Sequence, residues 1–183
     1  TYIRAEDYHG LTSNTNWNGN RARKEFMNIL VDTLATYGGP IDMTDAEFSQ
    51  AKDKRVFLKM KKSMDIPSAS SSGDYGIGVY KFTARNADGS QATNYNPAYA
   101  STDFPIFRLA DAFLMRAEAN FNTGNTAEAV ADINLIRERA YGNTDGNITA
   151  AELTSQFILD ERAREFYYEA QRRTDLVRFG QFT

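Results

Sequence analysis

The chain has 183 residues, 42% of them hydrophobic, and a formal net charge of −3, which allows one domain with a sizeable core and disfavours nucleic acid as a partner. It has no cysteine and one histidine, His9, which excludes disulfides, thiolate metal sites, cysteine nucleophiles and histidine-rich zinc sites within this sequence. No apolar run approaches transmembrane length and no basic leader opens the chain, so we expect a fragment of a longer secreted protein.

The first part of the chain is predicted to hold loops around an amphipathic helix. Residues 1–17 are polar and aromatic, which favours a loop. Residues 23–37 place apolar side chains three and four positions apart and are followed directly by Gly38, which predicts a helix that stops abruptly. A short second helix is predicted at residues 44–52 from a capping pattern at its start.

The middle of the chain is predicted to hold short strands and loops. Residues 55–61 place the segment Val-Phe-Leu-Lys-Met between basic residues and could form a strand or a helix. Residues 67–78 are rich in Ser and Gly, which indicates a flexible surface loop. A short strand is predicted at 78–84 and a further loop at 86–102.

Two helices joined by a tight turn are predicted after that loop. Residues 108–122 are amphipathic, Gly124 provides a left-handed stop, and residues 126–140 form the second helix, with Asn125 and Glu128 as its capping box. The short connection and many alanines predict an antiparallel hairpin. Its predicted core faces are Leu109, Phe113, Leu114, Ala117 and Phe121 in the first helix and Ala129, Ile133, Ile136 and Ala140 in the second.

A third helical segment is predicted to follow Gly142. Thr149 and Glu152 have the spacing of a capping box at its start, and no Gly or Pro interrupts the chain before Gly180. Such a segment is long for one helix of a globular protein, so we expect a break near Ala170.

Several motifs in this second half occur together in an order that we recognise. The turn after residue 122 resembles that of a tetratricopeptide hairpin. The motifs are FPIFRLAD at 104–111, AEA at 117–119, NLIR at 134–137, ILDERAREF at 158–166 and DLVRFG at 175–180. Together they resemble the C-terminal half of the SusD/RagB family of outer-membrane nutrient-binding lipoproteins, over about the last 80 residues and more weakly at residues 16–26.

The resemblance implies a mainly α fold. It would be a SusD-like α–α superhelix of tetratricopeptide-like helix hairpins, with long loop-rich insertions and few short strands. Residues 1–107 would form a loop-rich, ligand-facing segment with one amphipathic helix, and residues 108–183 would form the helical scaffold. Together they would make one domain.

The resemblance also implies a function without catalysis or cofactor. The protein would bind an oligosaccharide, starch-like or another glycan, and deliver it to a SusC-like TonB-dependent transporter. It would be a surface-exposed lipoprotein of the outer membrane, held by a lipid anchor upstream of this chain. The alternatives are RagB-like peptide capture and a helical protein-interaction scaffold without a small ligand.

Aromatic side chains in polar loops are the candidate ligand-binding residues. An aromatic ring can cover the C–H face of a sugar while neighbouring amide and guanidinium groups bind its hydroxyls. The alternative for the tryptophan is a hydrophobic anchor where loop meets helix. The candidates are Trp17, Asn18, Arg21, Tyr8, Tyr75, Tyr95 and Tyr99.

Two further patterns could indicate a metal site or a catalytic site. Residues 143–152 partly match a calcium-binding loop, but Tyr141 occupies the first ligand position, so we favour a plain turn with a capping box. The dense charges of residues 161–178 could hold a carboxylate pair, but we favour a structural ion network that ties the last helices to the hairpin through Glu118. No metal site and no catalytic residue is predicted.

Overall fold

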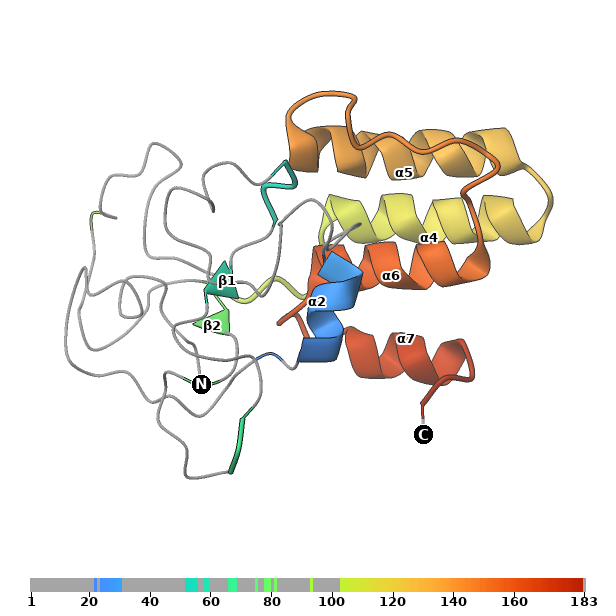
Figure 1. Ribbon diagram of the computed structural model, residues 1–183. Helices are drawn as coiled ribbons and strands as arrows, with labels where there is room; N and C mark the ends of the chain where they lie inside the picture. Colours follow the sequence, from blue (N-terminus) through green and yellow to red (C-terminus); the bar gives the residue numbers. More distant parts are fainter. Residues whose placement is uncertain are drawn as a thin grey trace. The chain divides into compact units, whose positions relative to one another are not determined.

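The computed structural model describes residues 22, 24–30, 52–55, 58–59, 66–68, 75, 78–79, 81, 93 and 103–182. The chain divides into two compact units, one formed by residues 1–50 and 57–103 and the other by residues 51–56 and 104–183. The secondary structure of the described part is mainly helical with two very short strands, which confirms the predicted fold class (Figure 1).

The first unit contains helix α2 (Lys24–Leu30) and the strands β1 (Leu58–Lys59) and β2 (Gly78–Val79). The strands pair antiparallel, with Leu58 opposite Val79. Strand β1 resolves the open choice for residues 55–61. Strand β2 confirms only the start of the strand predicted at 78–84: Lys81 is already outside it, and residues 80 and 82–84 lie outside the described residues. Helix α2 confirms the start of the helix predicted at 23–37; the rest of that helix, and all of the predicted helix at 44–52 except Lys52, lie outside the described residues.

The second unit is built on the predicted helix hairpin. Helix α4 (Leu109–Asn122) and helix α5 (Thr126–Tyr141) pack along each other, and α4 also packs against helix α6 (Ser155–Phe166) (Figure 1). Gly124 has a φ of 82°, the left-handed conformation predicted for it, and Gly142 after α5 has a φ of 77°. The capping box predicted at the start of α5 does not form: the side chain of Asn125 makes no cap hydrogen bond, and its amide donates to the Thr123 hydroxyl.

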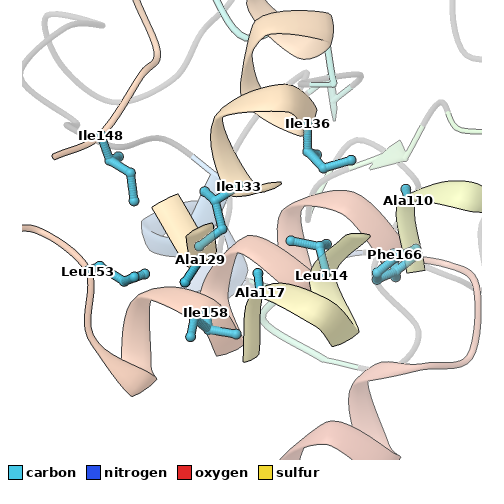
Figure 2. Close-up of a cluster of buried hydrophobic side chains, with 10 residues drawn as sticks. All are labelled: Ala110, Leu114, Ala117, Ala129, Ile133, Ile136, Ile148, Leu153, Ile158 and Phe166. Atoms are coloured by element: carbon cyan, nitrogen blue, oxygen red, sulfur yellow. The ribbon is translucent and has the colours of Figure 1, made fainter. Parts of the chain in front are cut away.

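The core of this unit lies where α4, α5 and α6 meet (Figure 2). The four predicted core residues of α5 are buried, as are Leu114 and Ala117 of α4, while Phe113 and Phe121 pack against the cluster from its edge. Leu109 was predicted in the core but is 71% exposed. Ala110, the next residue, takes the inward position together with the buried Asp111, whose carboxylate accepts a hydrogen bond from Arg162 of α6.

Helix α6 begins later than predicted. Glu152 does accept hydrogen bonds from the Thr149 amide and hydroxyl, each at 2.8 Å, but these residues form a turn. The helix begins at Ser155, where the hydroxyl of the N-cap Thr154 accepts from the Phe157 amide at 3.0 Å. The non-helical chain before it places Ile148 and Leu153 in the core (Figure 2), which a helix from residue 149 would not do.

The predicted break near Ala170 is confirmed. Helix α6 ends at Phe166 and helix α7 (Arg172–Arg178) begins after a turn in which Tyr168 and Ala170 have φ values of 60° and 61°. Gly180 follows α7 with a φ of 66°. Across the part of the chain that the structure describes, each helix is too short or too polar to span a bilayer.

Candidate functional site

The ligand-binding residues proposed from the sequence lie almost entirely outside the described residues. Tyr75 is the exception: it is half-buried and forms a single β-bridge in the first unit. The positions of the other candidates, Tyr8, Trp17, Asn18, Arg21, Tyr95 and Tyr99, are not described, so their grouping into one site stays a prediction.

The charged residues of α6 form a buried ion network in the second unit. The side chain of Glu161 is fully buried and accepts hydrogen bonds from Arg55 at 2.7 Å, from Arg137 at 2.8 Å and from Arg164 at 3.3 Å. Arg164 lies one helical turn from Glu161 on the same helix, a spacing at which opposite charges attract. One carboxylate on α6 therefore joins three arginines from three segments of the chain.

Glu165, one turn further along α6, is the second centre of this network. It accepts from Arg139 of α5 at 2.6 Å, from Arg55 at 3.2 Å and from Arg108, which lies directly before α4. Arg108 also donates to both carboxylate oxygens of Glu169, at 2.8 and 2.9 Å. The like-charged pair Glu165 and Glu169 is thus bridged by one guanidinium, which removes the repulsion that their spacing would produce.

A second set of ion pairs joins α4 to α6 and α7. Arg162 donates to both oxygens of Asp175 and to Asp111, each at 2.9 Å. Arg178 binds Asp175 at 3.0 Å and Glu118 of α4 at 2.9 Å. The predicted tie between the last helices and the hairpin through Glu118 is therefore confirmed.

The electrostatics of the network keep the carboxylates of Glu161 and Glu165 ionised. Burial by itself would raise the pKa of Glu161, but the positive charges of Arg55, Arg164 and Arg137 outweigh it and lower that pKa to about 2. Burial also opposes ionisation of Glu165, yet Arg55, Arg139 and Arg108 lower its pKa. A carboxylate held in this state cannot donate a proton near neutral pH, so the network is suited to holding helices together.

The charge pattern of residues 161–178 predicts the network members in α6 and α7, but it does not indicate those that lie earlier in the chain. These are Asp53, Arg55, Arg108, Asp111, Arg137 and Arg139. Arg55 donates to both oxygens of Asp53, and its guanidinium reaches Glu161 and Glu165, more than 100 residues later in the chain. The carbonyl of Arg55 also accepts from the Tyr167 hydroxyl at 2.6 Å. The local pattern Lys-Asp-Lys-Arg at 52–55 is typical of an exposed turn, and nothing in it indicates a buried arginine.

The loop at 143–152 has the geometry of a turn. The side chain of Asn143 accepts from the Asp145 amide at 2.9 Å, and Asn147 donates to Glu138 at 2.7 Å. Among the residues that the structure describes, no group of three His, Cys, Asp or Glu side chains is arranged to hold a metal ion.

Comparison with known proteins identifies relatives along nearly the whole chain. The sequence model of the SusD family matches residues 6–183. The chain is 44% identical over 108 residues to the starch-binding protein SusD of Bacteroides thetaiotaomicron, a match that covers 59% of this chain and 18% of that protein. It is 38% identical over 78 residues to the SusD-like protein P25 of Formosa agariphila, covering 41% of this chain and 15% of that protein.

Solved structures agree with this at the level of the fold. A SusD superfamily protein from Bacteroides vulgatus superimposes with a TM-score of 0.51 at 20% identity, covering 87% of this chain and 33% of that one. The matches to the two curated relatives span only 18% and 15% of the length of those proteins.

Proposed function

The chain belongs to the SusD family, and from that premise we propose that the protein binds an oligosaccharide of the starch class, or another glycan, at the cell surface. The observation that carries the proposal is the 44% identity over 108 residues to a starch-binding protein. We further propose that the bound glycan passes to a SusC-like TonB-dependent transporter, and that the protein is an outer-membrane lipoprotein anchored by a lipid on an upstream segment.

A binding role is preferred over catalysis because the carboxylates of the charged run are engaged in ion pairs. Glycoside hydrolysis needs one carboxylic acid with a raised pKa beside a second carboxylate. Glu161 and Glu165 have lowered pKa values instead, and each is held by several arginines. Turnover of starch in a reducing-sugar assay would contradict this assignment.

We propose that the loops of the first unit contact the glycan. The ring of Trp17 would cover the C–H face of a sugar, while Asn18 and Arg21 would bind its hydroxyls. The tyrosines at positions 8, 75, 95 and 99 would extend this surface. Affinity would be modest, because a sugar loses hydration that the protein must replace with equivalent hydrogen bonds.

Native electrophoresis of the full chain in gels containing soluble starch tests the proposal. Starch should retard the wild type, Trp17→Ala should abolish most of the retardation, and Trp17→Phe should keep part of it, because a ring is still present. Phe182→Ala is the matched control: it removes an aromatic side chain that is 51% exposed but lies in the second unit.

Each outcome of that experiment has a separate meaning. Retardation that Trp17→Ala leaves unchanged would keep the function and remove Trp17 from the site. A wild type that binds no glycan on an array, yet binds peptides, would replace this proposal with peptide capture. Binding of neither class by a folded protein would favour a helical interaction scaffold.

A further inference from the structure

The turn between α6 and α7 has residues other than glycine in the left-handed conformation, unlike the other helix ends of this unit. Helices α4, α5 and α7 are each followed by a glycine in the left-handed conformation: Gly124, Gly142 and Gly180. After α6 the left-handed positions are occupied by Tyr168 and Ala170. A β-carbon is disfavoured there because it approaches the following carbonyl oxygen. This turn therefore places a tyrosine where the backbone preference favours glycine.

The residues on both sides of Tyr168 hold the turn in place. Tyr167 is buried, and its hydroxyl donates to the Arg55 carbonyl at 2.6 Å. Glu169 is also buried. Its carboxylate accepts hydrogen bonds from Arg108, and its backbone amide donates to the Phe166 carbonyl at 3.0 Å. Because its neighbours are fixed inward, the side chain of Tyr168 is directed to the surface, where it is 36% exposed.

The Tyr168 ring is also fixed in orientation. It packs against the ring of Tyr167 edge to face, with centroids 6.5 Å apart and planes at 79°. Burial raises the pKa of its phenol above the usual value, so the hydroxyl stays protonated and remains a donor at physiological pH. A partly exposed aromatic ring that is held in one orientation has little ordering cost when a ligand covers it.

We propose that Tyr168 is a glycan contact in the second unit, where its ring stacks on the C–H face of a sugar. Backbone strain that the surrounding structure enforces is concentrated at ligand-contacting positions, where the side chain is needed. The inference rests on the proposed glycan binding and extends it to a position far in the sequence from the loop aromatics. Ala170 is the internal comparison, since it has the same strain and a side chain too small to stack.

Variants of the full chain separate a ligand contact from a purely structural turn. Tyr168→Leu keeps the β-carbon and much of the apolar volume but lacks a ring, and Tyr168→Gly removes both ring and strain. Both should weaken retardation in starch gels and the affinity for maltooligosaccharides in calorimetric titration by about three- to tenfold. Tyr168→Phe should bind nearly as the wild type does. Ala170→Gly should raise the thermal midpoint and leave binding unchanged.

The result that overturns this inference alone is a wild type that binds glycan while Tyr168→Leu and Tyr168→Gly, both folded by circular dichroism, bind equally tightly. A wild type that binds no glycan overturns the proposed function and this inference with it. Weakened binding in both ring-free variants, together with normal binding by Ala170→Gly, is the expected result.

Discussion

Replacement of Glu161 by glutamine is the sharpest test of the buried ion network. The substitution preserves the shape of the side chain but removes the negative charge that Arg55, Arg137 and Arg164 share. A folded-state pKa of about 2 against an ordinary value of 4.5 corresponds to about 3 kcal/mol of stability at neutral pH, since each unit is worth about 1.4 kcal/mol. That agrees with the roughly 3–5 kcal/mol typical of removing one partner from a buried pair.

The stability lost in Glu161→Gln should depend on pH, in a direction set by the lowered pKa of Glu161. Because the folded-state pKa of Glu161 is lowered, its stabilisation is complete above the unfolded-state value of 4.5 and is lost as the pH falls through about 2. The free-energy difference between wild type and Glu161→Gln should therefore shrink from about 3 kcal/mol at pH 7 to roughly 1 kcal/mol at pH 3.

Urea unfolding followed by circular dichroism at both pH values measures these differences. Glu128→Gln is the control, because Glu128 is exposed in the first turn of α5 and its replacement should change stability by no more than about 0.5 kcal/mol. If Glu161→Gln costs no more than this control at pH 7, or its cost does not decrease at pH 3, the assignment of the network as a stabilising, ionised cluster is wrong.

Three further substitutions test local features of the second unit. Thr154→Ala removes the hydroxyl that caps α6 and should lower the free energy of unfolding by about 1 kcal/mol. Asn125→Ala removes no cap hydrogen bond from α5 and should lower it clearly less. Equal losses in urea unfolding would contradict the cap assignment. Ile133→Ala opens a cavity in the core and should lower the free energy of unfolding by about 2–5 kcal/mol. The side chain of Leu135 is 50% exposed, so Leu135→Ala should lower it by less than about 0.5 kcal/mol. Gly142→Ala forces a β-carbon into a φ of 77° and should lower stability by roughly 1–2 kcal/mol; an unchanged thermal midpoint would show that the turn relaxes.

The hairpin could be predicted because its signals are local. The spacing of Ala129, Ile133, Ile136 and Ala140 determines the buried face of α5, and Gly142 determines where it ends. The break before α7 was also predicted, since a segment of that length needs support that one domain does not supply. Such features depend on residues within a few positions of one another, so they can be inferred before any tertiary contact is known.

The start of α6 and the composition of the ion network could not be predicted in this way. Thr149 and Thr154 both satisfy the local rules for an N-cap, and the choice of Thr154 follows from the burial of Ile148 and Leu153 in the core. The sequence does predict the tie through Glu118, which binds Arg178 of α7. The site proposed from the sequence, centred on Trp17, stays a prediction.

The sequence by itself determined the mainly helical class, the hairpin with its glycine stops, and the family, because these depend on periodicity and on motifs in a fixed order. Only the tertiary structure decided that Arg55 reaches Glu161 and Glu165, and that Tyr168 is held in a left-handed turn by its buried neighbours. The physical reason is the same for both. Burial and ion pairing across more than 100 residues are set by where the chain folds back on itself, and no local preference of Arg55 or Tyr168 favours the conformation or contacts observed.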